Sequence, residues 1–401
     1  MTIENENKKY RLAYFVTHPI QYQAPLLKLL SARPEIDLKV FFVRDFSLSA
    51  HILHEFSSGA KWDTPLLSGY GYSFLHKIFD IDSNSFFTPV VFGVKGALRE
   101  KKWDAIWIHG YNHYSLIIAI VLSFLFRIPI FYRSESNLQS TRPNILKNMF
   151  VRILVKISKA LLFIGNENKK YYKYFGAPES KLFFTPYAVD NYFFDEQYGK
   201  IDERDQKFRN ELNIEDKTIV ILFSGKLIKR KNPILLLDAF NEVTRNDVSS
   251  DFCLIFVGDG EESPTLRKRI KDLKLEKTVK LVGFINQSEI RKYYSIADLL
   301  VLPSSLETYG LVINEAMNAS TAIIASDKVG AASDLVWDEV NGFVFQSENL
   351  GSLIQVLKKA LSSKEKLRKM GKQSLRIISK WNYEVNVLGI IGALKSISND
   401  R

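Results

Sequence analysis

Short apolar runs alternate with longer helical patterns along the whole chain, and polar turns separate them. In the first half these runs cover residues 12–16, 38–43, 105–109, 128–132, 161–165 and 182–186. A second series covers residues 219–224, 253–257, 279–282, 299–303 and 322–325. Because strands buried on both faces read as continuous apolar runs, the pattern predicts parallel sheets wrapped by helices, an α/β fold.

A polar stretch at residues 191–217 separates the two series, and its clustered charges predict little burial. A chain of 401 residues also exceeds the size of one ordinary core. We therefore expect two doubly wound, Rossmann-like domains facing across a cleft, with ligands at the carboxyl ends of the strands. The expected division is an N-terminal domain at 1–190, a linker at 191–216, a C-terminal domain at 217–380 and a C-terminal helix at 381–401 that packs back on the N-terminal domain.

The composition favours an ordinary globular protein of the reducing cytoplasm. The single cysteine, Cys253, lies inside an apolar run and excludes a disulfide framework. The first ten residues lack the apolar segment of a secretory signal, so export is not expected. The most apolar stretch, residues 115–126, is shorter than the roughly 20 residues of a membrane-spanning helix and predicts a buried helix.

The net charge of +11 is concentrated in the first half, where residues 1–190 hold 24 Lys and Arg against 15 Asp and Glu. Such a bias suits anionic lipid, an anionic substrate or nucleic acid, and composition does not choose among them.

The densest group of chemically informative residues lies between 299 and 335. An apolar strand ending at Pro303 is followed by a polar loop with Glu307, and a helix expected from Gly310 carries Glu315. The spacing aims both carboxylates at one pocket, where they can accept hydrogen bonds from sugar or ribose hydroxyls. The amides around Gly310 and Leu311 open the helix and suit phosphate oxygens.

A basic turn follows the strand at 219–224. Lys226 and Lys231 are placed there to neutralise a diphosphate, directly after Gly225. An isolated pair of lysines at this spacing usually lies in a solvated turn without a binding role. The position of this pair at a strand end favours binding of a diphosphate instead.

The second half resembles the donor-binding domain of the family 4 retaining glycosyltransferases, the group 1 glycosyl transferases with the GT-B fold. The resemblance covers residues 217 to about 380, and the following features carry it: Glu307 and Glu315 in an E-x7-E pair, the turn with Gly225, Lys226 and Lys231, VGDG at 257–260, and GFI at 283–285 followed by ADLLVLPS. Many members have arginine at the position of Lys226, and lysine keeps the charge without the bidentate fork.

The resemblance implies a transfer of a hexose-type sugar from a nucleotide-diphosphate donor to a hydroxyl of a glycan or lipid-linked acceptor, in cell-surface polysaccharide or lipopolysaccharide assembly. Lys226 and Lys231 would hold the diphosphate, Glu315 the ribose and Glu307 the transferred sugar. Tyr309 and the backbone of Gly283, Phe284 and Ile285 complete the expected donor site. No nucleophilic carboxylate is implied, so retention is expected by front-face substitution without a metal or other cofactor.

The first half resembles the acceptor-binding domain less closely. THPIQYQAP at 17–25 stands where many relatives have a glycine-rich loop, and WIHGYN, YRSES, IGNEN and PYAVDN follow later strands. Each fragment taken alone is more often a turn or capping device, and Arg133 and Glu135 could simply pair. Their convergence on one sheet edge favours an acceptor pocket with these candidates: His18, Gln21, His109, Arg133, Glu135 and Asn166.

Metal binding is not expected. His18, His109 and His113 do not form a tight two-histidine motif with a carboxylate, and the D-x-D string at residues 80–82 is short enough to occur by chance.

Residues 144–163 combine one basic and one apolar helical face. Lys147, Arg152, Lys156 and Lys159 stand among isoleucines, leucines and Phe150. An ordinary surface helix and a helix docking on anionic lipid, at the inner face of the membrane, explain this pattern equally well.

Three other functions remain as alternatives. A nicotinamide-dependent oxidoreductase lacks support because no GxGxxG follows the first strand. A sugar-nucleotide epimerase shares the two-domain architecture and would release nucleotide without an acceptor. A nucleic-acid-binding protein is supported only by the charge, and it would need exposed aromatics among the basic residues, as near Tyr171, Tyr172 and Tyr174.

Overall fold

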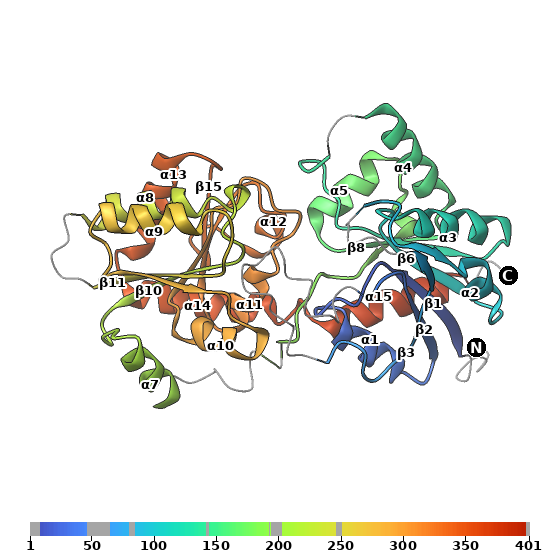
Figure 1. Ribbon diagram of the computed structural model, residues 1–401, viewed down its shortest axis with the longest axis horizontal. Coiled ribbons are helices and arrows are strands. Elements are labelled where there is room, and N and C mark those ends of the chain that lie inside the picture. Colours follow the sequence, from blue (N-terminus) through green and yellow to red (C-terminus); the bar gives the residue numbers. More distant parts are fainter. Residues whose placement is uncertain are drawn as a thin grey trace, which may run out of the picture. The chain divides into compact units, whose positions relative to one another are not determined.

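The computed structural model describes residues 9–45, 65–79, 85–141, 144–191, 193, 203–245 and 251–397. They form two compact units. Unit 1 combines the described residues up to Tyr187 with those from Tyr383 onward, and unit 2 contains those from Ala188 to Asn382. Both units are layered α/β structures with a parallel sheet at the centre (Figure 1).

The sheet of unit 1 has the strand order β3-β2-β1-β6-β7-β8-β9, and every neighbouring pair is parallel. Its strands are β1 (Tyr10–Val16), β2 (Ile36–Phe42), β3 (Gly71–Phe74), β6 (Ala105–His109), β7 (Ile130–Arg133), β8 (Ala160–Phe163) and β9 (Leu182–Phe184). A separate antiparallel pair is formed by β4 (His76–Phe79) and β5 (Val90–Phe92).

Helices cover both faces of this sheet. The helices of unit 1 are α1 (Ala24–Ser31), α2 (Val94–Arg99), α3 (Tyr114–Leu125), α4 (Ile145–Ile157), α5 (Asn166–Tyr174) and α15 (Tyr383–Ser396). One core cluster joins the sheet to α2, α3, α4 and α5, and a second joins its other face to α1 and α15. The sheet of unit 1 is therefore buried on both faces, by apolar side chains of the strands and of the helices that cover them.

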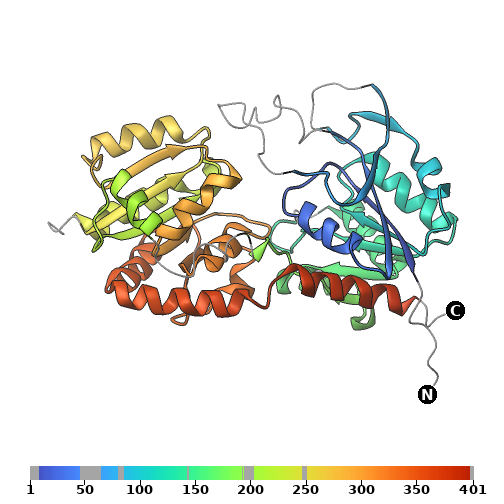
Figure 2. The same cartoon turned by 90° about the horizontal axis from the view of Figure 1, so that it is seen from below.

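The C-terminal helix α15 belongs to unit 1, although the preceding chain lies in unit 2. It packs on α1, β8 and β9, as Figure 2 also shows. Gly389 permits this approach, because a Cβ there would lie 2.0 Å from the carbonyl oxygen of Phe184. Asn386 Nδ2 adds a hydrogen bond of 2.8 Å to the carbonyl of Pro186.

The sheet of unit 2 has the parallel order β12-β11-β10-β13-β14-β15. Its strands are β10 (Ile219–Ser224), β11 (Phe252–Val257), β12 (Val279–Gly283), β13 (Leu299–Leu302), β14 (Ala322–Ser326) and β15 (Gly342–Phe345). Its helices are α7 (Glu203–Glu211), α8 (Pro233–Thr244), α9 (Ser263–Asp272), α10 (Gln287–Ile296), α11 (Val312–Asn318), α12 (Ala332–Leu335), α13 (Leu350–Leu361) and α14 (Lys364–Ile378). The main core cluster joins the sheet to α8, α9, α13 and α14.

The predicted α/β class with two Rossmann-like sheets is confirmed, and each predicted apolar run coincides with a strand to within a few residues. The pattern did not reveal β3 and β15. The segment expected to be a linker contains α7, which packs on α10. Its Arg209 is buried and donates to the carbonyls of Ile296 and Thr218, so the charged residue caps backbone groups instead of facing solvent.

Two helix predictions from the first half are corrected. The apolar stretch at 115–126 is α3, but only one side of it is buried, and Val121, Phe124 and Leu125 are exposed. The amphipathic segment 144–163 is a helix only as far as Ile157, after which residues 160–163 form the buried strand β8. No helix within the described parts of the chain is long and apolar enough to cross a membrane.

Candidate functional site

The basic turn of unit 2 is tied to the loop that follows β13. Lys229–Lys231 form a single 3-10 turn after β10, and Asn232 ends it in the left-handed region. The amide of Ser305 donates to the carbonyl of Arg230 at 2.8 Å, and Asn232 Nδ2 donates to the carbonyl of Pro303 at 3.1 Å. Because β10 and β13 are neighbours in the sheet, the two loops meet at its carboxyl edge.

These contacts bring Lys231 against Glu307. The ammonium and the carboxylate form an ion pair in which each side chain keeps only 13% of its surface exposed. The backbone of Glu307 is held by the loop after β14, since its amide donates to the carbonyl of Lys328 and its carbonyl accepts from Gly330. Two of the residues predicted to be catalytic thus lie in direct contact at the junction of β10 and β13.

Strand order makes this junction the natural ligand position. From β10 the strands follow one another outward to β12 on one side of the sheet, and from β13 they follow one another outward to β15 on the other side. The strand order therefore changes direction between β10 and β13, which makes this a topological switch point. Crevices at such switch points, outside the carboxyl ends of the strands, are where doubly wound sheets bind ligands.

Glu315 is buried in α11 and has a defined partner. The Tyr294 hydroxyl lies 2.6 Å from Glu315 Oε2 and 3.1 Å from Ser224 Oγ. Tyr294, on α10, was missed by sequence reasoning because a tyrosine in a helix carries no sign of the residue it will contact. Ser224 is the last residue of β10, so the network reaches the same sheet edge as Lys231.

Lys226 lies in the same basic turn and is partly buried. Burial, reinforced by the charges of Arg230 and Lys231, lowers the pKa of its ammonium group. The four cationic side chains of residues 226–231 repel one another, and an anion bound there would relieve this repulsion.

Glycines let the loops after β10, β11 and β12 pack backbone to backbone. A Cβ at Gly258 would lie 1.9 Å from the carbonyl oxygen of Gly225, and one at Gly260 would lie 2.5 Å from that of Leu227. The amide of Gly258 donates to the carbonyl of Gly283 at 2.8 Å. The VGDG and GFI segments therefore pack closely together beside the basic turn. Within the GFI segment, Phe284 and Ile285 are half-buried.

The remaining donor candidates lie around the start of α11. This helix begins at Val312, two residues later than expected, and Leu311 is its N-cap. Gly310 has a φ of 106°, and a Cβ there would lie 3.0 Å from Val329. Tyr309 is buried in the same loop, and its carbonyl accepts from Ala331.

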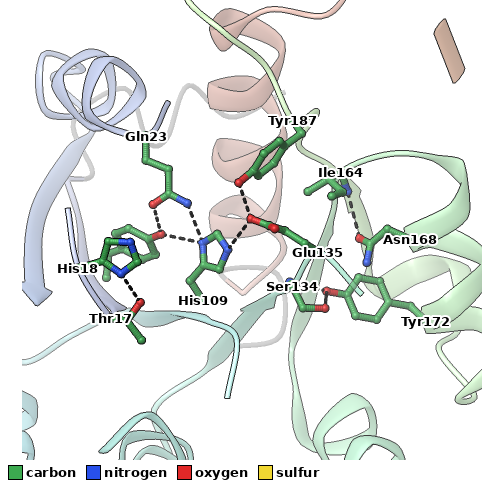
Figure 3. A network of polar contacts seen from close by, with 11 residues as sticks. Thr17, His18, Gln23, His109, Ser134, Glu135, Ile164, Asn168, Tyr172 and Tyr187 are labelled. Atoms are coloured by element: carbon green, nitrogen blue, oxygen red, sulfur yellow. Dashed lines mark hydrogen bonds and ion pairs between the residues drawn. The ribbon is translucent and has the colours of Figure 1, made fainter. Parts of the chain in front are cut away.

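Unit 1 has its own polar network at the carboxyl edge of β1, β6 and β7 (Figure 3). The Tyr14 hydroxyl lies 2.6 Å from Gln23 Oε1, and both side chains approach His109 Nδ1, at 2.8 and 2.9 Å. On the other side of the imidazole ring, His109 Nε2 lies 3.8 Å from Glu135 Oε1. Tyr187 donates to the same carboxylate oxygen.

The donors in this network define its protonation state. The Gln23 amide nitrogen can only donate, so His109 Nδ1 is the acceptor and the ring proton sits on Nε2, facing Glu135. Burial lowers the pKa of His109, although the nearby Glu135 carboxylate acts to raise it. The lowered pKa keeps the ring neutral at neutral pH. Burial opposes ionisation of Glu135, but the contacts with His109, Tyr187 and the charge of Arg133 outweigh it and lower its pKa.

Arg133 is buried and does not pair with Glu135. Its guanidinium carbon lies 5.4 Å from the Tyr187 ring centre and 5.9 Å from that of Trp107. Nε and Nη1 have no hydrogen-bond partner among the residues that the structure describes. The group therefore acts on Glu135 through its charge.

The other acceptor candidates lie at the margin of this network. The His18 ring forms a hydrogen bond with the Thr17 hydroxyl at 2.9 Å, and burial, together with the charge of Arg44, lowers the His18 pKa to about 4. Gln21 lies partly buried in the turn before α1, and the nearby Gln23, which the sequence analysis did not single out, contacts His109. Asn166 begins α5, whereas Asn168 makes the structural hydrogen bonds, to the Ile164 amide and the Ser136 carbonyl.

Within the described residues, no group of three or more His, Cys, Asp or Glu side chains is arranged to hold a metal. His113 instead caps α3, since its Nδ1 accepts from the backbone amide of Ser115 at 3.3 Å. The D-x-D string at residues 80–82 lies outside the described part of the chain. Tyr171 and Tyr172 are buried, so they are not positioned to stack on nucleic-acid bases.

The second half of the chain matches a known protein family. Residues 204–376 match the family model for glycosyl transferases group 1. The chain is 30% identical over 205 residues to the lipopolysaccharide 1,2-N-acetylglucosaminetransferase of Salmonella typhimurium. The matched stretch covers 49% of this chain and 52% of the relative. The chain is 31% identical over 185 residues to the N-acetylgalactosamine-N,N'-diacetylbacillosaminyl-diphospho-undecaprenol 4-alpha-N-acetylgalactosaminyltransferase of Campylobacter jejuni, covering 46% and 48%. The chain thus spans about half the length of these curated relatives.

Solved structures match the chain over nearly its whole length. Anabaena HepE in complex with UDP superimposes with a TM-score of 0.73 at 18% identity, covering 97% of this chain and 100% of that one. The sucrose-phosphate synthase of Thermosynechococcus elongatus gives 0.74 at 17% identity, covering 98% and 100%. These likenesses show the GT-B fold, in agreement with the prediction.

Proposed function

Residues 204–376 belong to the glycosyl transferases group 1, and from this premise we propose that the protein is a retaining glycosyltransferase using a nucleotide-diphosphate sugar. The observation that carries the proposal is the largely buried Lys231–Glu307 pair at the switch point of the unit 2 sheet. An ion pair removed from water contributes little to stability by itself, so its position at a ligand edge favours a role in binding.

The basic turn suits the diphosphate of the donor. Lys226 and Lys231 would neutralise its charge, and the backbone around Gly310 and Leu311 would contribute amide donors. The lowered pKa of Lys226 supports this assignment, because bound phosphate oxygens would replace the repulsion from Arg230 by attraction.

The two carboxylates suit hydroxyl groups. Tyr294 fixes one oxygen of Glu315 and so orients the carboxylate, which we assign to the ribose of the donor. Glu307 is assigned to the transferred hexose, with Lys231 holding it in place until the donor arrives. The loop of Gly283, Phe284 and Ile285 and the ring of Tyr309 would complete the pocket for the nucleotide.

The proposed chemistry is a front-face substitution that keeps the anomeric configuration. The bond from the anomeric carbon to the phosphate oxygen breaks, a bond to the acceptor oxygen forms on the same face, and the leaving phosphate takes the acceptor proton. Lys226 and Lys231 would stabilise the negative charge on that phosphate, each by roughly 2 to 4 kcal/mol. No metal or cofactor takes part in this scheme.

The acceptor is assigned to the network of unit 1. Glu135, held ionised by His109, Tyr187 and Arg133, can accept a hydrogen bond from a sugar hydroxyl. Relatives named for lipopolysaccharide and for a diphospho-undecaprenol substrate support a glycan or lipid-linked acceptor in polysaccharide assembly.

The first test is a calorimetric titration of the protein with UDP, GDP, ADP and CMP, with and without EDTA. We expect one nucleoside diphosphate to bind selectively and independently of EDTA. The Lys231→Ala variant should lose affinity by on the order of tenfold or more, because a charge-assisted contact to phosphate is removed. Lys229→Ala is the matched control, since Lys229 is an exposed lysine of the same turn.

The outcomes separate the alternatives. Equal effects of both substitutions, or no binding of any nucleotide, would contradict the donor site. Release of nucleotide from a bound nucleotide sugar without any acceptor would favour the epimerase-like activity. Retention is checked by the anomeric configuration of the product in nuclear magnetic resonance, where an inverted product would exclude front-face substitution.

A further inference from the structure

Helix α4 carries a second apolar stripe that faces away from the sheet. Its buried side is formed by Val151, Leu154 and Val155, which join the core. Ile145, Met149 and Ile153 follow one another at intervals of four residues on the opposite side, and their exposed fractions are 86%, 54% and 51%. The expected division into one basic and one apolar face is therefore incomplete, since apolar residues occupy both sides.

Helix α3 has the same property. Leu116, Ala119 and Ile120 enter the core cluster that also contains the buried side of α4, so the two helices cover one face of the sheet (Figure 1). The outer side of α3 exposes Phe124 by 56% and Leu125 by 65%. We call the outer sides of these helices, with residues Ile118, Val121, Phe124, Leu125, Ile145, Leu146, Met149 and Ile153, the α3–α4 surface.

Basic residues accompany this surface almost without acids. Arg152 and Lys156 lie on the outer side of α4, seven and eleven residues after Ile145, and Arg127 is exposed just after α3. Residues 144–159 hold four arginines and lysines and no acidic residue. Within the described part of the chain, Lys147, Arg152 and Lys156 make no ion pair.

The α3–α4 surface combines exposed apolar side chains with cations that form no ion pair among the described residues. A partner for this surface must both cover the apolar side chains and neutralise the cations. An anionic bilayer does so, because the apolar side chains enter the boundary of headgroups and acyl chains while lipid phosphates neutralise the cations. A second copy of this chain would bring cations against cations. We infer that the α3–α4 surface docks on an anionic lipid bilayer, an interaction that stands apart from the donor site of unit 2.

The inference is tested by flotation with phosphatidylcholine vesicles that contain or lack phosphatidylglycerol. The full-length protein should float with the anionic vesicles and lose this binding at high salt. Met149→Glu with Ile153→Glu should abolish binding to the anionic vesicles. Arg152→Glu with Lys156→Glu should weaken binding to the anionic vesicles by on the order of tenfold or more.

The matched control is Lys28→Glu with Leu388→Glu. These two exposed residues lie on α1 and α15, which cover the opposite face of the same sheet, and their replacement should leave flotation unchanged. Unaltered nucleotide affinity and melting temperature in all three double variants would show that the fold is intact. Loss of nucleotide binding would concern the donor site and not the surface.

Three results would overturn the inference. The wild-type protein could fail to float with anionic vesicles, or the Met149/Ile153 variant could float as well as the wild type. Light scattering could also reveal a dimer that Met149→Glu dissociates, which would make a second copy the occupant of the surface.

Discussion

The hydroxyl of Tyr294 lies 2.6 Å from Oε2 of Glu315, and both side chains are buried in unit 2. The two residues are 21 positions apart and come from different helices, α10 and α11. A buried carboxylate needs donors to remain charged, and a tyrosine hydroxyl that also contacts Ser224 supplies one in a fixed direction. Tyr294 therefore acts as a positioning residue for the carboxylate that we assign to the ribose.

Tyr294→Phe should weaken binding of the preferred nucleoside diphosphate by on the order of tenfold, because a hydrogen bond to a charged group contributes about 1.5 kcal/mol or more. The same variant should discriminate less between that nucleotide and its 2'-deoxy form. Calorimetry with both ligands measures the two effects. Tyr293→Phe, the neighbouring substitution, is the control, and full ribose discrimination in Tyr294→Phe would exclude the positioning role.

Glu307→Gln should abolish sugar transfer while the protein stays folded. The amide keeps the shape of the side chain but removes the charge that pairs with Lys231. Transfer is measured with the donor identified by calorimetry, and circular dichroism checks the fold. Turnover near that of the wild type would remove Glu307 from the proposed site.

The ion pair itself predicts a pattern in stability. Lys231→Met leaves the Glu307 carboxylate without its partner in a largely buried place, which costs on the order of 3 kcal/mol. The double variant Lys231→Met with Glu307→Gln removes both charges and should be more stable than Lys231→Met alone. Denaturant unfolding of the wild type, the two single variants and the double variant gives the coupling energy, and additive effects would mean that the pair is not formed in solution.

Gly258→Ala should disrupt the packing of the glycine loops beside the proposed donor site. Its Cβ would lie 1.9 Å from the carbonyl oxygen of Gly225, and its φ of 135° is strained for any residue with a side chain. We expect a lower melting temperature and loss of nucleotide binding. Gly96→Ala is the control, because Gly96 lies in α2 with no atom within 4 Å of its Cβ position. That change should leave binding intact and raise stability by roughly 0.5 to 1 kcal/mol.

The buried histidines predict sensitivity to acid. Burial and the charge of Arg44 lower the pKa of His113 from 6.5 to about 4. The unfolded chain therefore takes up a proton that the folded protein resists, so the free energy of unfolding decreases as the pH falls from 6.5 to about 4. His113→Asn keeps an acceptor for the start of α3 and cannot titrate. Its stability should fall less over this pH range, as chemical denaturation at each pH would measure, and an unchanged slope would contradict the assignment.

The sequence by itself determined the two sheets and the local position of the residues that we propose for donor binding. Apolar runs such as 105–109 and 219–224 coincide with β6 and β10, because a strand buried on both faces has no polar position to interrupt it. Gly225, Lys226 and Glu307 were placed correctly at strand ends for the same local reason.

Contacts between distant parts of the chain were decided by the tertiary structure. Lys231 and Glu307 are 76 residues apart, and only the adjacency of β10 and β13 in the sheet brings them together. The same holds for Tyr294 with Glu315, and for Gln23 with His109. The sequence of α3 could not tell which of its apolar sides is covered, because burial depends on how many other elements pack against a helix. Periodicity reports the environment along one element, whereas strand order and packing fix which elements meet.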